Sequence, residues 1–372
     1  MTGTWAEEAD GTRLGSPQPY ADPVRSQYRG NVAMKHGLKV AGIALAVSTV
    51  LAGCGTTAAT SPSASGGAAA GGQAAATYDP SVAAPKPKDG KRLKIGVTFP
   101  ILDQFLQKLA DGMKARAAAD GVTLIIVAAQ EKTDVQLGQV ENFVSQQVDG
   151  IIIIPVDTEA AGPMTQKANG AKIPLAYVNR RPSDLPKGVP YVGSDSLVAG
   201  KLEMEALAKL VGQKGNVAIL QGDPANEAAQ MRTKGCKDVV AKYPNMKVTK
   251  EQSGNWYRDK GLSITENWMQ SGQKVDVICS NNDEMALGAI QALKEAGKTN
   301  QVKVGGTDAT ADALAAMKAG SLAVTVFQDA KGQGAGSVDV IVKLHNKETV
   351  PGFLNVPYQL VTPANMAEFV NK

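Results

Sequence analysis

The amino-acid sequence predicts an α/β protein made of two similar lobes, each a doubly wound parallel sheet with helices on both faces. From about residue 92, apolar runs of strand length alternate with segments of helical periodicity at the spacing of βαβ units. The run GIIIIPV at 150–156 is continuously apolar and β-branched, which is typical of a strand buried on both faces. The alternation restarts after about residue 194, and this restart predicts a second lobe with a cleft between the two.

The first lobe contains helices whose apolar residues recur at helical spacing. The helix at 105–121 carries such a face and stops at Gly121, because glycine tolerates the left-handed conformation of a helix end. The helix at 134–150 shows the same pattern. We predict strands at 92–99, 122–129, 150–156 and 173–179, and helices at 105–121, 134–150 and 162–171.

The second lobe repeats this order of elements. The glycine-rich stretch GQGAG at 332–336 lacks the Lys-Ser/Thr that follows a phosphate-binding loop, so we interpret it as the entry to a helix. We predict strands at 216–222, 246–254, 275–281, 302–308 and 322–329, and helices at 192–215, 227–243, 258–272, 284–298, 309–320 and 335–346.

Composition excludes several classes of function. The chain has 372 residues, of which 43% are hydrophobic and 20% charged, enough for a large core. The net charge of +4 comes from 39 basic and 35 acidic residues, a balance that argues against nucleic acid as a partner. The three cysteines and two histidines show no zinc-ligand spacing, so we expect no metal site and no cofactor.

The segment from Met34 to Cys54 has the layout of a secretory signal. Two lysines precede a short apolar run, and small residues precede Cys54 in the sequence LAGC, which matches the lipobox of bacterial lipoproteins. We therefore expect a lipoprotein signal peptide at 34–53 and a lipid on Cys54, although an ordinary signal with an incidental cysteine is the alternative. Residues 1–33 have no periodicity, and we interpret them as a disordered or mis-annotated extension upstream of the true start at Met34.

Residues 54–91 are rich in Ala, Gly, Ser and Pro and nearly uncharged until their end. Such a segment buries too little apolar surface to fold, so we predict a flexible tether. The expected arrangement is a lipid-anchored, extracytoplasmic protein with its globular body beyond residue 91.

Polar side chains follow most of the predicted strands. Ligands of open parallel sheets bind beyond the carboxyl ends of the strands. Amide, carboxylate and guanidinium groups suit vicinal hydroxyls, which both donate and accept, and aromatic faces suit the C–H side of a ring. The pattern therefore predicts a site for a small polyol. The residues at these strand ends are Asp103, Phe105, Asn179, Arg180, Asp223, Asn226, Arg232, Trp256, Asn281, Asn282, Asp308 and Gln328.

Residues 92–372 resemble the periplasmic sugar-binding proteins of bacterial ABC importers, especially the ribose-binding type. The motifs DQFLQKLADG, YVNRRP, YVGSDSLVAGK, AILQG, NNDEMALGAIQALKEAGK and VGGTDATADALAAMKAGSLAVTVFQD follow the order of that family. The resemblance implies a type I periplasmic binding protein fold and a hinge of three crossings near Ser194, Gln328 and Asn355. It further implies an N-terminal lobe of 92–194 plus 329–356 and a C-terminal lobe of 195–328 plus 357–372. A monomer that delivers its ligand to the transmembrane subunits of a permease is expected.

Carried over by position, the ligand contacts of the family fall on a subset of the strand-end residues. Departures from the ribose type occur at Asn179, where it has aspartate, at Asp103, where it has asparagine, and at Trp256, where it has phenylalanine. The stretches GDPANEAAQMRTKG and EQSGNWYRDKG look more like the inositol- and rhizopine-binding branch, so ribose itself is not assumed. The implied contacts are Asp103, Phe105, Asn179, Arg180, Arg232, Trp256, Asn282, Asp308 and Gln328.

Several residues keep a second interpretation. Asp308 either contacts ligand or caps the next helix, and Trp256 is either a stacking platform or part of the core. Asp223 and Asn226 are more typical of loop residues. Cys236 and Cys279 either pair in an oxidising compartment or stay apart, since one is on a predicted helix and the other in a predicted strand.

Three other functions have less support in the sequence than ligand binding for transport. No nucleophile–base pair or acid pair is recognisable, so an enzyme is not expected. A sugar-responsive repressor would need a helix-turn-helix where this chain has a signal and tether. Presentation of the bound ligand to a chemoreceptor or sensor kinase is compatible with transport and leaves no signature in the sequence.

Overall fold

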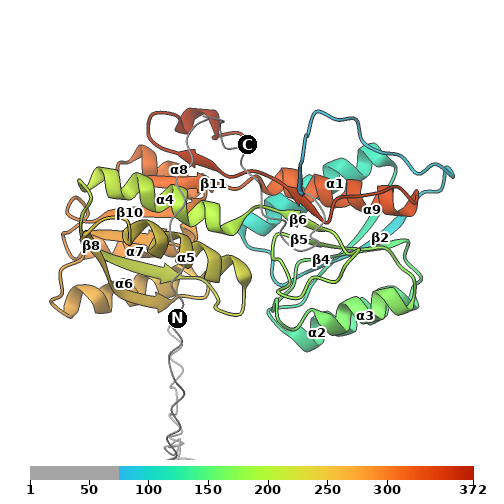
Figure 1. The fold of residues 1–372 in the computed structure, drawn as a ribbon, viewed down its shortest axis with the longest axis horizontal. Helices are drawn as coiled ribbons and strands as arrows, with labels where there is room; N and C mark the ends of the chain where they lie inside the picture. Colours follow the sequence, from blue (N-terminus) through green and yellow to red (C-terminus); the bar gives the residue numbers. More distant parts are fainter. Residues whose placement is uncertain (1–74) are drawn as a thin grey trace, which may run out of the picture. The chain divides into compact units, whose positions relative to one another are not determined.

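The computed structural model describes residues 75–372, and the predicted signal peptide and Cys54 lie outside this part of the chain. The described residues form two sheets, each covered by helices on both faces (Figure 1). The predicted α/β class is confirmed. No helix from residue 75 onward is both long enough and apolar enough to span a membrane.

The first sheet has seven strands in the order β1-β12-β6-β5-β4-β2-β3, and all of its neighbouring strands run parallel. Helices α1 and α9 cover one face, and α2 and α3 cover the other (Figure 1). The strands are β1 (Ala75–Thr77), β2 (Lys94–Phe99), β3 (Thr123–Ala128), β4 (Gly150–Ile153), β5 (Leu175–Val178), β6 (Tyr191–Gly193) and β12 (Phe353–Asn355). The helices are α1 (Gln104–Asp120), α2 (Thr133–Ser145), α3 (Gly162–Gly170) and α9 (Ala330–His345).

Strand β4 and the residue after it show why the sequence is continuously apolar there. Ile152 and Ile154 join the hydrophobic cluster under α1 and α9, whereas Ile151 and Ile153 join the cluster under α2 and α3. Successive side chains of a strand point to opposite faces, so a strand buried on both sides needs apolar residues at every position. This placement agrees with the expectation from the sequence.

The second sheet has six strands in the order β13-β11-β10-β9-β7-β8, parallel except for β13, which is antiparallel to β11. Helices α4 and α5 pack on one face, and α6, α7 and α8 pack on the other. The strands are β7 (Lys214–Gln221), β8 (Asn245–Ser253), β9 (Val277–Ser280), β10 (Lys303–Asp308), β11 (Val324–Phe327) and β13 (Gln359–Val361). The helices are α4 (Ser196–Leu210), α5 (Glu227–Val240), α6 (Arg258–Gln270), α7 (Asp283–Glu295), α8 (Ala311–Lys318) and a short 3₁₀ helix (Met366–Glu368).

Several element boundaries differ from the sequence prediction, and contacts in the structure explain two of them. The predicted helix at 192–215 begins only at Ser196, because Tyr191–Gly193 pairs as β6 between β5 and β12 and Asp195 caps the helix. The last long helix begins at Ala330, before the predicted start, and includes the glycines of GQGAG. A Cβ on Gly334 would lie 2.2 Å from the carbonyl oxygen of Leu109, so this glycine permits close packing of α9 on α1.

The chain passes from one sheet to the other three times. It crosses between β6 and α4, between β11 and α9, and between β12 and β13. The described elements on either side of these crossings separate into the two sheets, which is the arrangement of a three-crossing hinge.

Residues 75–89, assigned to the tether from sequence, belong to the first lobe. Strand β1 extends the sheet by pairing with β12, and the amide of Tyr78 donates to the carbonyl of Asn355 at 2.8 Å. Asn346 accepts from the amide of Lys88 at 2.9 Å and donates to the carbonyl of Lys86 at 3.0 Å. Main-chain pairing at a sheet edge needs no apolar periodicity, so the pairing of this N-terminal strap, residues 75–89, could not be predicted from the sequence.

A buried charge cluster lies beneath the strap. Arg116 donates to both carboxylate oxygens of Asp339, at 2.5 and 2.7 Å, and to the carbonyl of Val82 at 3.1 Å. Asp120, one helical turn along α1, has a fully buried carboxyl group 3.9 Å from Arg116 Nε. Burial and the repulsion of Asp339, only partly offset by Arg116, raise the pKa of Asp120 to about 7.

The raised pKa of Asp120 makes the free energy of unfolding depend on pH. Since its pKa is higher in the folded chain than the usual value of 3.8, folding stability falls as the pH rises from about 4 towards 7. Asp120→Asn removes the charge and should raise the free energy of unfolding at pH 8 by about 2–4 kcal/mol, with the gain vanishing near pH 4. Chemical denaturation at both pH values measures it, and Asp111→Asn on the exposed side of α1 is the control. An equal gain at the two pH values would contradict this account.

Candidate ligand-binding site

One cavity between the two sheets is lined by all nine residues that the resemblance assigned to the ligand. They follow the carboxyl ends of strands or begin the next helices, which is where open parallel sheets bind ligands. Leu106 and Ala228, which the sequence analysis did not single out, complete the lining. The nine residues are Asp103, Phe105, Asn179, Arg180, Arg232, Trp256, Asn282, Asp308 and Gln328.

The polar lining of this cavity is shielded from solvent. Arg180, Arg232, Asn282, Asp308 and Gln328 each expose 8% or less of their surface. A larger cavity of about 280 Å³ adjoins it and shares three of its lining residues. The inner groups are thus covered by residues from both sheets.

Asp103 both caps a helix and lines the cavity in the first lobe. As the N-cap of α1 it accepts a hydrogen bond from the amide of Leu106 at 2.7 Å through one carboxylate oxygen. Burial raises the pKa of the Asp103 carboxyl, an effect opposed by the Leu106 amide and by the charge of Arg180. The helix cap thus fixes the direction in which this carboxyl group meets the cavity.

Arg180 and Asn179 follow β5 and are held from behind. Arg180 Nη1 donates to the carbonyls of Pro155 and Val156 at 3.2 and 3.3 Å. Complete burial lowers the pKa of Arg180, although the acidic groups of Glu131, Asp103 and Asp223 act against this. Asn179 Nδ2 donates to Gln333 Oε1 at 3.0 Å, so the amide orientation is set by α9.

Arg232 is the centre of the second-lobe side of the site. Its guanidinium donates to Asn281 O at 2.7 Å, to Gln328 Oε1 at 2.6 Å and to the Tyr358 hydroxyl at 2.8 Å. Asp308 lies 3.8 Å away. Burial disfavours the charge on Arg232, but Tyr358 and Asp308 outweigh it and the pKa is raised.

Asp308 is a ligand candidate and not a helix cap. Burial raises its pKa well above the usual value, against the attraction of Arg232. The N-cap of α8 is Thr310, whose side chain accepts from the amide of Ala313 at 3.3 Å. Asp283 holds the turn from behind, because its carboxylate accepts from the amide of Thr310 at 2.9 Å.

Trp256 is both a core residue and a wall of the cavity. It packs against the second-lobe core, and its ring lies so close to Gly222 that a Cβ there would come within 2.3 Å. The guanidinium carbon of Arg232 is 5.8 Å from the ring centroid. The indole Nε1 is buried and has no hydrogen-bond partner among the described residues.

Asn282 serves as the N-cap of α7. Its Oδ1 accepts from the amide of Met285 at 3.1 Å, and its Nδ2 donates to the carbonyl of Trp256 at 3.1 Å. The other strand-end residues do not line the cavity: Asp223 closes a turn through the amide of Ala225 at 2.9 Å, and Asn281 accepts from Gly222 N at 3.1 Å.

Three of the nine lining residues have unusual backbone conformations. Asn179 has φ 65°, Trp256 has φ 73° and Asp308 has φ 128°. Non-glycine residues rarely adopt positive φ, and such conformations persist where surrounding contacts enforce them, often at binding sites. These conformations were not visible in the sequence, and non-glycine residues outside the cavity also have positive φ.

Tyr358 and Gln333 are site-supporting residues that the sequence reasoning missed. Tyr358 lies on the third crossing and bonds to Arg232, while Gln333 links Asn179 to Ser194 on the first crossing through a 3.0 Å hydrogen bond. Ser194 in turn donates to the carbonyl of Val356. Tyr358 comes three residues after β12, a short strand that the sequence did not predict, and Gln333 lies one turn inside α9. Neither was therefore among the predicted strand-end residues.

The comparisons with known proteins agree with this architecture. A family model described as a periplasmic binding protein domain matches residues 95–349. A Rhizobium meliloti protein named for rhizopine binding is 44% identical over 286 residues, covering 75% of this chain and 93% of that protein. A ribose import binding protein of Salmonella typhimurium is 33% identical and covers 69% of this chain and 86% of its own length.

A solved structure extends the comparison. An ABC transporter solute-binding protein from Bacillus halodurans, determined with bound myo-inositol, has a TM-score of 0.74 and 44% identity, covering 76% of this chain and 99% of that one. These relatives are binding proteins of transporters and not enzymes. The chain belongs to the periplasmic binding protein domain family, as a binding protein without an expected catalytic activity.

Proposed function

We propose that this protein captures a small cyclic polyol in the cavity between its lobes and delivers it to the transmembrane subunits of an ABC importer. The observation that carries the proposal is the lining itself, because two guanidiniums, two carboxyl groups, three amides and two aromatic rings converge on one buried space. Such groups satisfy vicinal hydroxyls in pairs, and the rings cover the apolar face of a sugar or inositol.

An inositol-type ligand fits the departures from the ribose type better than ribose does. Asp103, Asn179 and Trp256 differ from the ribose pattern, and each lines the cavity. A relative at 44% identity was solved with myo-inositol, and a second myo-inositol-bound protein from Caulobacter has a TM-score of 0.72 at 27% identity. We therefore take myo-inositol and its substituted forms as the first ligands to test.

Ligand capture would proceed by hinge closure. Contacts come from both lobes, so a ligand that bridges them binds the closed form more tightly than the open form and shifts the population towards it. Thr158 Oγ1 donates to the carbonyl of Ala225 at 2.7 Å and adds a direct contact between the lobes. Arg232 bonds to Gln328 and Tyr358, which stand at two of the crossings, so the site and the hinge share residues.

We also propose that Cys54 carries the lipid that keeps the protein at the membrane surface. Cys54→Ser should move the protein from the membrane fraction to the soluble extracytoplasmic fraction, because the signal without its acylated cysteine provides no anchor. Fractionation followed by immunoblotting measures this, with Cys236 and Cys279 left intact. Retention of the variant in the membrane fraction would contradict lipid anchoring.

Ligand-dependent thermal stabilisation tests the binding proposal. The purified protein is heated with myo-inositol, amino-inositols, D-ribose, D-allose or xylitol, and a ligand at 100 times its Kd should add about 2.7 kcal/mol of stability. Asp308→Asn keeps the shape but changes the hydrogen-bonding pattern, and should weaken binding about 5- to 100-fold, as a lost buried hydrogen bond does. Glu266→Gln, outside the cavity, is the control. The absence of stabilisation by every polyol would refute the proposed function.

Two substitutions of Asn282 separate its role as a helix cap from its proposed role in ligand binding. Asn282→Ala removes the cap of α7 and should cost about 1 kcal/mol of stability without ligand, whereas Asn282→Ser retains a capping oxygen and should cost less. Both changes remove the amide and should weaken polyol binding equally. Denaturation curves and calorimetric titrations measure the two effects. If Asn282→Ser bound polyol like the wild type, Asn282 would be a cap only.

A further inference from the structure

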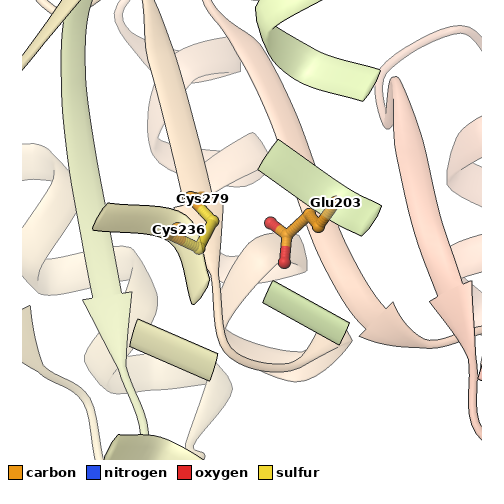
Figure 2. A group of neighbouring side chains, drawn as sticks. All are labelled: Glu203, Cys236 and Cys279. Atoms are coloured by element: carbon orange, nitrogen blue, oxygen red, sulfur yellow. A yellow bond between two sulfur atoms is a disulfide. The ribbon is translucent and has the colours of Figure 1, made fainter. Parts of the chain in front are cut away.

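We propose that a disulfide between Cys236 and Cys279 is a positioning element of the ligand site, acting through Arg232. The pairing that the sequence left open is formed in the structure, across a sequence separation of 43 residues. It joins helix α5 to strand β9 inside the second lobe (Figure 2). This inference rests on the proposed function, since its consequence is expressed in polyol binding.

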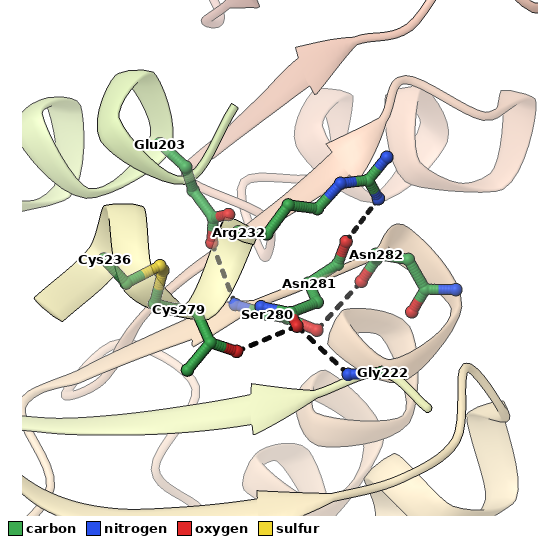
Figure 3. Close-up of a disulfide and its surroundings, with 9 residues drawn as sticks. Glu203, Gly222, Arg232, Cys236, Cys279, Ser280, Asn281 and Asn282 are labelled. Atoms are coloured by element: carbon green, nitrogen blue, oxygen red, sulfur yellow. Dashed lines mark hydrogen bonds between the residues drawn. A yellow bond between two sulfur atoms is a disulfide. The ribbon is translucent and has the colours of Figure 1, made fainter. Parts of the chain in front are cut away.

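The cross-link lies directly behind the cavity. On α5, Cys236 comes four residues after Arg232, so both side chains lie on the same face of the helix, one turn apart. On β9, Cys279 comes two residues before Asn281, whose carbonyl accepts the 2.7 Å hydrogen bond from Arg232 (Figure 3). One covalent link therefore joins the helix that carries the guanidinium to the strand that accepts its hydrogen bond.

The end of β9 is fastened by other groups as well. Glu203 on α4 accepts from the amide of Ser280 at 2.8 Å (Figure 3). Thr233, next to Arg232 on α5, donates to Asn281 Oδ1 at 3.0 Å. These hydrogen bonds hold the strand end from α4 and α5, but they are weak compared with a covalent bond. The disulfide keeps α5 and β9 at a fixed spacing when these hydrogen bonds break.

The same three side chains do not suit a metal ion. One Glu203 oxygen and the two sulfurs lie within 4.8 Å of one another (Figure 2). The sulfurs are bonded to each other, however, and a disulfide offers no thiolate to a cation. Both cysteines are fully buried, so a dissolved reductant reaches them only when the lobe opens. The cluster is therefore a permanent fastening and not a redox switch.

The expected benefit is a pre-oriented arginine. A long, rotamer-rich side chain loses conformational freedom when it is fixed by a ligand, and a support that fixes it beforehand reduces that loss. Arg232 donates hydrogen bonds to Gln328 and Tyr358, so its placement affects two of the chain crossings. Without the cross-link, α5 has freedom to shift along β9, and Arg232 would have to be re-ordered each time a ligand binds.

The test compares calorimetric titrations of the full chain with myo-inositol. Replacing the pair, Cys236→Ala with Cys279→Ala, should raise the Kd by roughly 2- to 10-fold, the effect of one side chain to be re-ordered. Leu322→Ala, a cavity in the opposite core of the same lobe, is the control: it lowers the Tm but should leave the Kd unchanged. An unchanged Kd in the folded double variant would overturn the inference.

A double-mutant cycle shows whether the effect passes through Arg232. In an Arg232→Lys background the loss of the disulfide should cost little further affinity, while in an Arg180→Lys background it should cost the full amount. Equal losses in both backgrounds would show a general structural role and overturn the inference. Where the double alanine variant does not fold, wild-type protein reduced in mild denaturant and refolded under reductant takes its place.

A ligand-free measurement separates this inference from the proposed function. If no polyol binds the wild type, the proposed function fails, and Trp256 then reports on the disulfide alone. The indole lies 5.8 Å from the Arg232 guanidinium, so its emission, with Trp5 and Trp268 replaced by phenylalanine, should change when the cysteines are replaced. Unchanged emission would mean that the disulfide does not position Arg232.

Discussion

The arrangement of the cavity depends on the hydrogen bonds of one buried guanidinium group, that of Arg232. A charge taken out of water is costly unless hydrogen bonds and opposite charges compensate it. Here Arg232 donates to Asn281 just after β9, to Gln328 at the second crossing and to Tyr358 on the third crossing. Its Nε has no hydrogen-bond partner among the described residues. The hydrogen bonds of one cation thus tie the lining of the cavity to two of the chain crossings.

Several features of the cavity lining cost free energy in the folded chain. Burial raises the pKa of both Asp103 and Asp308, and three lining residues hold positive φ angles that cost on the order of 1–3 kcal/mol each. None of this helps the ligand-free chain to fold. Under the proposed function, a polyol whose hydroxyls pair with the two carboxyl groups offsets part of the cost of burying them once both lobes contact it. The stored cost therefore favours closure around a ligand over closure around an empty cavity.

The sequence predicted those cavity residues to which one structural rule applied, the position of the carboxyl ends of parallel strands. Parallel strands bring their carboxyl ends to one edge, so residues distant in sequence, such as Asp103 and Asp308, were expected in one cavity and lie there. Strand β6 was missed because its three residues are too short for a periodic signal, and β1 because edge pairing uses main-chain groups. Tyr358 and Gln333 were missed because their role comes from contacts across the chain crossings.

Asp103 shows how capping and recognition limit each other. One carboxylate oxygen is committed to the Leu106 amide, so only the other is available to the cavity. An asparagine, which the ribose type has at this position, can cap the helix equally well, because both residues are good N-caps. Helix stability therefore does not decide between the two residues. What differs is the group presented to the ligand, an acceptor oxygen with partial charge instead of an amide donor. Under the proposed function, the aspartate at position 103 therefore bears on ligand specificity and not on the stability of α1.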